Sequence, residues 1–551
     1  MLFPLLFFAL FYFYPLSAII GVSGLAGLSA TLADPHTWRV VGFTFWQATL
    51  STILTFALGL PAAYLVGRYR FRGQTLLRAL TAIPFVMPTL VVAAGFNALL
   101  GPNGWLALAL AALRLPPLNI VNTLAAILLA HVFYNTTIVM RLVGDYWGRL
   151  DPRLPQAAQT LGLTPLRAFA AVTLPLLVPA LLAAALLVFI FDFTSFGVIL
   201  VLGNPRLATL EVEIYRQTFA FFNLPAAAAL ALLQLACTFG LAIAYTRLSA
   251  HASRPIGLRA PAPQPLVTAQ QKLAALAVIT VLIILLNGPL IALAVRSVTP
   301  LDAEARSLAH PSPAFTFDYY RALFTADRGS AFFVTPIATV GNSLRYALIT
   351  VALSLALGLP TAWTLAMRQH SNQRAARRSS GVLEALLLLP LGTSAVTLGL
   401  GFLLAFNRAP LNLRASPILV PLAHTLIAFP FVVRALLPTW QSIRPQWRQA
   451  AATLGASPWQ TWQRIDLPLV GRAALVAAAF AFAISLGEFG ATALINRPEY
   501  PTIPLAIYTF LGRPGALNYG RALALSTLLM IITGGSILAI ERLRLKNLTD
   551  F

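Results

Sequence analysis

Two stretches of this sequence have the same construction. Arg149–Leu177 reads RLDPRLPQAAQTLGLTPLRAFAAVTLPLL, and Ser442–Val470 reads SIRPQWRQAAATLGASPWQTWQRIDLPLV. Each contains Gln-Ala-Ala, three residues, a glycine, nine residues, and then a β-branched residue, any residue and Leu-Pro. The second copy lies 293 residues after the first. A long segment that returns with its spacing intact indicates that one structural unit occurs twice, and this decides the fold.

The repetition extends well beyond these stretches. Further pairs share the offset of 293: Leu129–His131 with Leu422–His424, Arg141 with Arg434, Trp147 with Trp440, and Ala208–Tyr215 with Pro501–Tyr508. Ala57–Pro61 returns as Ala356–Pro360 at an offset of 299. We therefore expect two homologous halves, 1–247 and 273–551. The segment between them, 248–272, is rich in proline and has no periodicity, which is typical of a semi-rigid linker.

The composition indicates a membrane protein. Of the 551 residues, 58% are hydrophobic and only 10% are charged, whereas soluble domains carry roughly 25% charged residues. An ordinary soluble enzyme and a disordered chain are thus excluded. The single cysteine, Cys237, excludes a disulfide scaffold and a cysteine-based metal cluster. It lies in an apolar run, where we expect a small buried side chain.

Apolar stretches long enough to cross a bilayer as helices occur twelve times. About 20 residues are needed for a hydrocarbon core of roughly 30 Å. The predicted spans are about 2–25, 43–66, 79–100, 120–142, 175–202, 223–246, 273–295, 343–367, 382–406, 417–437, 470–495 and 520–540. The run 105–115 is too short to span. The sequence therefore predicts an all-α polytopic fold with about twelve transmembrane helices, six in each half.

Basic residues indicate the orientation. The loops on one side, including 141–172 and 434–466, hold 23 basic and 5 acidic residues, against 12 and 8 on the other side. By the positive-inside rule the first set is cytoplasmic, together with both termini. The net charge of +22 is spread over many segments adjoining the membrane. A nucleic-acid partner is not expected, because such a protein concentrates its charge on one face.

The repeated segments predict two short helices each. An Ala-rich helix should stop at Gly162 and Gly455, and Thr164-Pro165 and Ser457-Pro458 should begin the next one. Either this is only a connection between spans, or its small side chains dock into a groove of another protein. The length of about 30 residues and the repeated spacing favour docking.

This pattern resembles the coupling loop of the permease subunits of type I binding-protein-dependent ABC importers, in two copies along almost the whole chain. The resemblance implies coupling loops at about 144–175 and 438–468 that contact two copies of a separate ABC ATPase subunit. It assigns this coupling to Gln156, Ala157, Ala158, Gly162, Pro175, Gln449, Ala450, Ala451, Gly455 and Pro468. Both copies carry Gln where the family usually has Glu, which puts a salt bridge to the ATPase at that position in doubt.

A fused double permease is typical of thiamine and iron(III) importers. The segments Phe193–Gly203, Ala208–Tyr215 and Ile503–Leu525 resemble the thiamine permeases, whereas the Glu488-Phe489-Gly490 segment is shared with the iron(III) branch. The implied function is passage of a small solute, thiamine or a phosphorylated form, across a bacterial cytoplasmic membrane by alternating access. An extracytoplasmic binding protein would deliver it. An iron(III) importer and, further off, an ion-coupled secondary transporter are the alternatives.

The chain has no means of its own to hydrolyse ATP. A phosphate-binding loop needs Gly-Lys-Ser/Thr, and the only lysines are Lys272 after Gln271 and Lys546 after Leu545. We expect a permease subunit that is not an enzyme and holds no cofactor, with ATP and magnesium on the ATPase. No metal-ligand spacing is present among His, Asp and Glu.

Few ionisable residues lie inside the predicted spans, where they are costly and often functional. Asp192 lies in the fifth span, and Glu488 in the eleventh aligns with Ser195. We hypothesise that Asp192, Ser195 and Glu488 face the translocation path; the alternative is that they bond to neighbouring helices. For His131 and His424, which occupy matching positions, we expect a structural role across helices.

Overall fold

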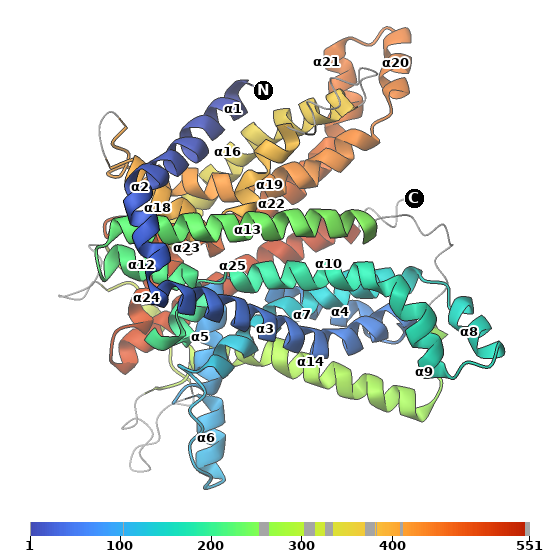
Figure 1. Cartoon of the computed structure of the whole chain (residues 1–551), viewed down its shortest axis with the longest axis horizontal. Coiled ribbons are helices and arrows are strands. Elements are labelled where there is room, and N and C mark those ends of the chain that lie inside the picture. Colours follow the sequence, from blue (N-terminus) through green and yellow to red (C-terminus); the bar gives the residue numbers. More distant parts are fainter. Residues whose placement is uncertain are drawn as a thin grey trace. The chain divides into compact units, whose positions relative to one another are not determined.

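The computed structural model of the chain describes most of its residues (Figure 1). The described residues are 2–102, 104–252, 264–301, 315–325, 334–369, 381, 383–407 and 411–545, without the side chains of 249–252, 369, 537 and 539–545. The longer stretches outside them are 253–263, which belongs to the predicted linker, 302–314, 326–333, 370–380 and 546–551.

The chain forms two compact units. Unit 1 consists of Met1–Thr31, Ile214–Leu235 and Thr316–Phe551, and unit 2 of Leu32–Glu213 and Ala236–Phe315. The division cuts through helices α12 (Leu210–Phe219) and α13 (Leu224–Ala252). Each unit is built almost entirely of helices.

The remaining elements of unit 2 follow the chain order. They are α3 (Pro35–Arg68), β1 (Tyr69–Arg70), α4 (Gln74–Val86), α5 (Thr89–Leu100), α6 (Trp105–Ala112), α7 (Leu124–Arg149), α8 (Arg153–Thr160), α9 (Pro165–Ala168), η2 (Phe169–Thr173), α10 (Leu174–Phe193), α11 (Gly197–Leu202), η3 (Pro205–Leu207), β2 (Gln264–Pro265) and α14 (Ala269–Arg296). The two short strands pair in parallel, so the end of the linker is joined to the loop after α3.

Unit 1 has matching elements. They are α1 (Leu2–Phe8), η1 (Ala9–Phe13), α2 (Tyr14–Ala33, the last two residues of which fall in unit 2), α15 (Asp318–Arg321), α16 (Ala338–Gln369), η5 (Leu389–Gly392), α18 (Ala395–Ala405), α19 (Leu419–Ser442), α20 (Pro445–Thr453), α21 (Pro458–Thr461), η6 (Trp462–Asp466), α22 (Leu467–Gly487), α23 (Gly490–Ile495), α24 (Ile503–Leu511) and α25 (Ala516–Leu545).

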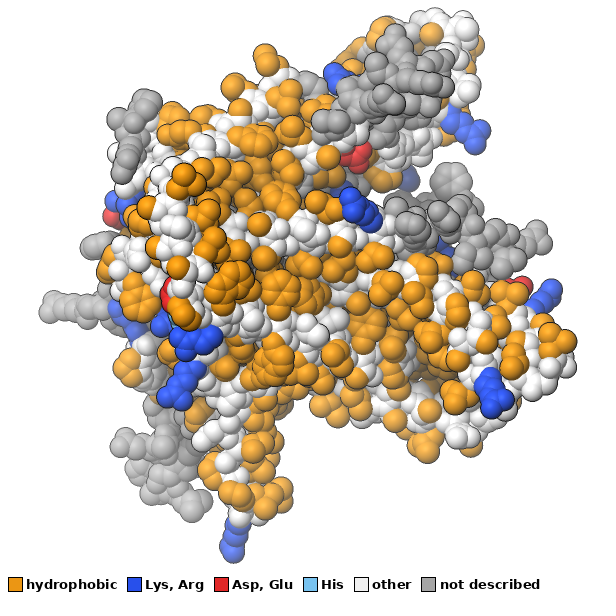
Figure 2. All heavy atoms as spheres, viewed as in Figure 1, with side chains coloured by type: hydrophobic (Ala, Val, Ile, Leu, Met, Phe, Trp, Pro, Cys, Tyr) orange, Lys and Arg blue, Asp and Glu red, His pale blue; other side chains and the backbone are white. Residues whose placement is uncertain are grey.

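Eleven helical segments among the described residues are long and apolar enough to cross a membrane, and α18 is a shorter apolar helix in the ninth predicted span. Their outer faces are apolar: Leu174, Val178 and Leu182 follow one another at every fourth residue of α10 and are 37–46% exposed. Figure 2 shows hydrophobic side chains over most of the visible face, with Lys and Arg gathered toward its edges. The polytopic all-α fold predicted from the sequence is confirmed.

Five predicted spans are interrupted or kinked. The first is kinked at Gly24, which has a φ of +56°. The spans 175–202 and 470–495 each consist of a long and a short helix, with breaks at 194–196 and 488–489. The third span breaks at Met87-Pro88, because proline disfavours helical geometry in the residue before it. The ninth passes through the short helix η5 before α18 begins.

The first span of each sequence half packs within the unit that holds the other half. In unit 1, the Phe8 ring lies edge-on to Phe429 at 5.0 Å, and the Tyr12 hydroxyl is 2.7 Å from Thr393 Oγ1. In unit 2, α14 packs against α5 so closely that a Cβ on Gly95 would lie 2.8 Å from the Pro289 carbonyl oxygen. The compact units are therefore not the predicted sequence halves 1–247 and 273–551, although the boundaries of the repeat itself remain a prediction.

Candidate functional site

The two repeated segments fold into helical hairpins of the same design, α8–α9 in unit 2 and α20–α21 in unit 1 (Figure 1). Each first helix ends at a glycine with positive φ, +93° at Gly162 and +80° at Gly455. The N–H of Leu163 bonds to the carbonyl of Ala158 at 3.2 Å, and Gly162 N–H to Gln159 at 3.0 Å. This is the Schellman arrangement, which only glycine adopts without strain. The helix-stop prediction is confirmed.

The second helix of each hairpin begins as predicted. The Thr164 hydroxyl accepts from the N–H of Arg167 at 3.4 Å, and the Ser457 hydroxyl accepts from Gln460 N–H at 3.2 Å. Gln460 returns a bond to the Ser457 N–H, which completes a capping box. A π-helical turn, η2 or η6, then leads into the next long helix. Proline is the second residue of both α10 and α22, directly after this π-helical turn.

The predicted coupling residues lie on these hairpins. Gln156, Ala157, Gly162, Gln449, Ala450 and Gly455 are exposed, Ala451 is half-buried and Ala158 is buried. Pro175 and Pro468 are exposed where the long helices begin. The role of these residues in contact with an ATPase subunit remains a prediction.

The tip of each hairpin carries an exposed leucine that the sequence reasoning did not single out. Leu161 and Leu454 occupy matching positions just before the two glycines, and both are 87% exposed. Exposed large apolar side chains at a fixed place in both copies are typical of a contact surface. The signal was present in the sequence, since Thr-Leu-Gly occurs in both segments.

A second paired feature is a buried cluster around each histidine. His131 Nε2 lies 2.9 Å from Ser195 Oγ, and His131 Nδ1 lies 3.5 Å from Asp192 Oδ1. The Asn135 amide donates to the same carboxylate oxygen at 2.6 Å, and Gln47 donates to the Asp192 backbone carbonyl at 2.9 Å. These bonds join α3, α7 and α10 inside unit 2.

The cluster in unit 1 also has a histidine beside one serine and one carboxylate, but the serine and the carboxylate have changed places. His424 Nδ1 is 2.8 Å from Ser485 Oγ, and His424 Nε2 is 3.2 Å from Glu488 Oε2. By the offset of 293, Ser485 corresponds to Asp192 and Glu488 to Ser195. Each histidine thus has one carboxylate and one serine beside it, in opposite order along the chain. Their bonds across helices agree with the structural role expected for both histidines.

The Glu488 carboxylate also caps α23. Its Oε1 accepts from the N–H of Ala491 at 2.8 Å, and Oε2 accepts from the N–H and the hydroxyl of Thr492 at 3.0 and 2.7 Å. Asp192 and Glu488 are 1% and 8% exposed, and Ser195 is half-buried. These bonds engage both oxygens of Glu488 but only Oδ1 of Asp192, whose Oδ2 is buried without a hydrogen-bond partner among the described residues. Whether they also face the path of the solute remains a prediction.

The short helices α12 and α24 form a matched pair, one in each half of the sequence. The first N–H of α12, that of Leu210, donates to Thr44 Oγ1 at 3.1 Å. The first N–H of α24, that of Ile503, donates to Ser343 Oγ at 2.9 Å. Each short helix is thereby held to the long helix, α3 or α16, that precedes it in its half. In the turn before α24, the Arg497 guanidinium pairs with the Glu499 carboxylate at 3.1 Å.

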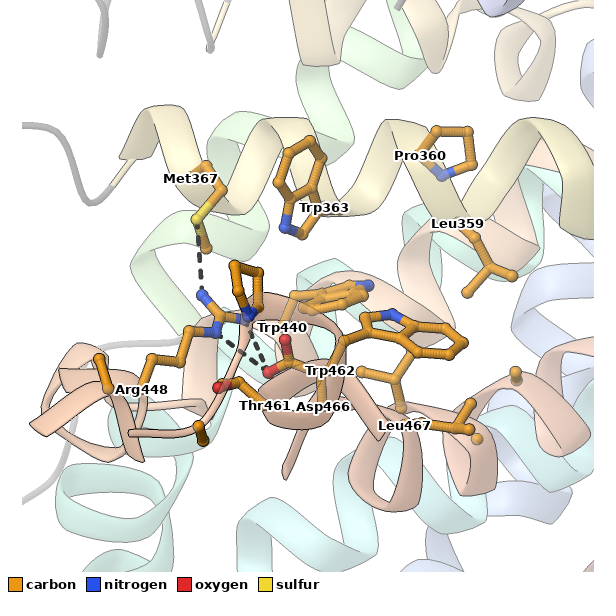
Figure 3. Close-up of a pocket in the computed structure, with 16 residues that line it drawn as sticks. Leu359, Pro360, Trp363, Met367, Trp440, Arg448, Thr461, Trp462, Asp466 and Leu467 are labelled. Carbon is orange, nitrogen blue, oxygen red and sulfur yellow. Dashed lines mark hydrogen bonds and ion pairs between the residues drawn. The ribbon is translucent and has the colours of Figure 1, made fainter. Parts of the chain in front are cut away.

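A cavity of about 710 Å³ lies at the base of the hairpin α20–α21, entirely within unit 1. Figure 3 shows Trp363 reaching from α16 toward Trp462 and the ion pair of Arg448 with Asp466. That pair is joined by two bonds, from Nε at 3.1 Å and Nη2 at 2.9 Å. Trp440 lies in the same wall. In the described part of the chain, no group of three His, Cys, Asp or Glu side chains could hold a metal ion.

Comparison with known proteins gives relatives along nearly the whole chain. The thiamine transport system permease protein ThiP of Escherichia coli K12 is 29% identical over 484 residues, 88% of this chain and 85% of the relative. ThiP of Brucella abortus strain 2308 is 29% identical over 502 residues, covering 91% and 86%. The probable ABC transporter permease protein y4fN of Sinorhizobium fredii is 27% identical over 515 residues, covering 91% and 87%.

Two other comparisons add little. No protein-family model matches the chain. A crystal structure of a bacterial ABC transporter involved in alginate import matches 45% of this chain with 16% identity and a TM-score of 0.37, too slight a likeness to argue from. The similarity to the curated relatives spans both halves, so along nearly its whole length this chain is similar to the thiamine transport system permease proteins.

Proposed function

We propose that this chain forms the complete transmembrane pathway of an ATP-driven importer for thiamine or a phosphorylated form of it. In this proposal two copies of a separate ATPase dock on the hairpins α8–α9 and α20–α21, and an extracytoplasmic binding protein delivers the solute. ATP and magnesium bind to the ATPase, whose closure opens the path outward. The chain sits in a bacterial cytoplasmic membrane with both termini in the cytoplasm.

The observation that carries the proposal is the matched construction of the two hairpins. Each presents its Gln-Ala pair and one leucine to solvent, and each is anchored by a capped second helix that runs into a long helix. A rigid hairpin with an exposed apolar tip suits transmission of a movement, because its glycine stop and cap hold it in one geometry. The glutamines can still donate and accept hydrogen bonds in place of the charge that the family usually has there.

The substrate assignment follows the curated relatives. Thiamine transport is named for the relatives of Escherichia coli, Salmonella typhimurium, Brucella and Haemophilus influenzae, at 27–29% identity. Asp192, Ser195 and Glu488 are proposed to line the path, where a carboxylate would suit a cationic solute. Because Glu488 and Asp192 already serve as internal hydrogen-bond acceptors, such a contact requires them to move between partners during the cycle.

The test is reconstitution of the full chain in liposomes with its ATPase and binding protein. We expect ATP hydrolysis that rises when the binding protein is loaded with thiamine, with accumulation of labelled thiamine inside. Ferric ion in place of thiamine is the matched control and should leave hydrolysis at its basal rate. Stimulation by ferric ion alone would overturn the substrate, and uptake without any ATPase would overturn the mechanism.

A further inference from the structure

The cavity at the base of α20–α21 comes from residues in which the two halves differ. Gly471 and Ala474 line it, and the offset of 293 places Val178 and Leu181 at the matching positions of the other half. A Cβ added to Gly471 would meet nothing within 4 Å. At these two positions the second half therefore has smaller side chains than the first half, where Leu181 packs against a hydrophobic cluster and Val178 is 40% exposed.

The matching region of unit 2 is filled by aromatic rings. The ring centroids of Tyr64 and Trp147 are 5.0 Å apart, and those of Trp147 and Phe169 are 6.0 Å apart. Val143, Leu150 and other buried side chains complete this hydrophobic cluster. The corresponding residues of unit 1, Trp363, Trp440 and Trp462, instead line the cavity.

The ion pair in the cavity wall also belongs to the second half alone. Arg448 and Asp466 correspond to Pro155 and Thr173. The guanidinium donates from Nε and Nη2 to Asp466 Oδ1, and its Nη1 has a weak contact of 3.6 Å with Met367 Sδ. Asp466 Oδ2 and Arg448 Nη1 therefore keep hydrogen-bonding capacity toward a ligand.

Trp440 supplies an independent sign of a ligand. Its side chain is 5% exposed and its Nε1 donor has no hydrogen-bond partner among the described residues. A buried indole N–H usually finds an acceptor, because leaving it unpaired costs about 1–3 kcal/mol. The cavity thus offers two donors, Trp440 Nε1 and Arg448 Nη1, and one acidic acceptor, Asp466 Oδ2.

The residues around the cavity indicate that it lies at the depth of the membrane headgroups. The cavity lies where α16 and α19 end and α22 begins. Arg444, Arg464 and Arg472 are exposed close to it along the chain, as is typical of arginines that reach lipid phosphates at the ends of spans. Leu359, Leu467 and Val470 form an apolar part of the wall. The volume of about 710 Å³ is within the usual range for small-molecule sites.

We propose that this cavity binds one phospholipid with an ethanolamine headgroup. The phosphate accepts from Trp440 Nε1 and Arg448 Nη1, the ammonium donates to Asp466 Oδ2, and an acyl chain covers Leu467 and Val470. Donors and an acid side by side match a headgroup that carries both charges. The lipid braces the hairpin α20–α21 against α16, and the first half needs none because its rings fill the space.

The experiment is native mass spectrometry of the purified full-length chain, together with lipid exchange from vesicles. We expect one phosphatidylethanolamine to remain bound to the unmodified chain. Gly471→Leu should reduce this occupancy at least about tenfold by filling the cavity, and Trp440→Phe about fivefold by removing one hydrogen bond. Val178→Leu, at the matching position in unit 2, is the control and should retain the lipid.

Vesicles of other composition test the headgroup. Phosphatidylcholine has no N–H to donate and phosphatidylglycerol has no ammonium, so both should bind about tenfold more weakly. Equal occupancy of Gly471→Leu and the unmodified chain would overturn the site, and equal binding of phosphatidylcholine would overturn the headgroup. Ala474→Leu, which installs the residue of the other half, serves if Gly471→Leu does not fold. The lipid measurement does not require thiamine transport. A failure of the proposed thiamine function would therefore leave the conclusion about the lipid site unchanged.

Discussion

His424 Nε2 lies 3.2 Å from Glu488 Oε2 in the interior of unit 1, and the same carboxylate caps the N-terminus of α23. The Glu488 side chain, at the break in the eleventh span, thus connects the long helix α19 to the short helix α23. In a hydrocarbon environment the N–H groups exposed by such a break must be bonded internally. Glu488 does this for Ala491 and Thr492.

Glu488→Gln should destabilise the chain by about 2 kcal/mol, because an amide offers one acceptor oxygen and would present N–H to a donor. Thermal unfolding in detergent measures this. Glu499→Gln is the matched control. The pKa of the Glu499 carboxyl lies below its usual value because of a bond to its own backbone N–H and the nearby Arg497, but this outer-loop pair is exposed and its loss should not change the melting temperature. A Glu488→Gln variant with the melting temperature of the unmodified chain would contradict the capping role.

Close approach of α3 and α7 depends on glycines. A Cβ on Gly144 would lie 3.0 Å from the Ala63 carbonyl oxygen, and one on Gly148 2.9 Å from that of Gly67. Small residues four apart on both helices let backbones meet. Gly144→Val should therefore destabilise unit 2 by more than about 2 kcal/mol. Gly42→Val, on α3 where an added Cβ meets nothing within 4 Å, is the control. Equal melting temperatures for the two variants would refute the close-packing argument.

The exposed leucines at the hairpin tips should matter for coupling and not for folding. Leu161→Ala and Leu454→Ala remove side chains that are 87% exposed, so the melting temperature should not change. ATPase binding should weaken about tenfold for each, as expected when an apolar anchor of an interface is lost. Leu113→Ala, at the exposed residue that directly follows α6, provides the comparison. Unaltered ATPase binding in both tip variants would remove the leucines from the contact surface.

The first span of each sequence half packs in the unit that holds the other half. This arrangement predicts how the chain behaves when it is divided into two fragments. Residues 1–252 and 264–551, expressed together, should assemble, because α1 packs on α16 and Phe429 while α14 packs on α5. Each fragment expressed alone leaves these faces uncovered and should be degraded or aggregate. Co-purification through a tag on one fragment is the measurement. Recovery of a monodisperse single fragment would show that the exchanged helices are dispensable.

Much of the architecture is local and therefore readable in the sequence. A Gly that needs positive φ, a Ser or Thr before Pro, and a Pro in the first helical turn fix each hairpin through short-range hydrogen bonds, so Gly162, Ser457 and Pro468 behave as predicted. The number of spans follows from runs of apolar residues. The breaks at 194–196 and 488–489 were missed, because Glu488 and Ser195 read as isolated polar residues until their hydrogen-bond partners are placed.

The sequence by itself determined that the chain crosses a membrane many times and that one six-span unit occurs twice, since composition and repetition need no partner in space. Only the tertiary structure decided which residues meet. It placed α1 with the second half and α14 with the first, brought His424 to Glu488, and left a cavity beside Gly471 where the other half is packed. The physical reason is that packing and hydrogen bonding between helices join residues far apart in the sequence, such as His424 and Glu488, and no local pattern encodes the distance between their side chains.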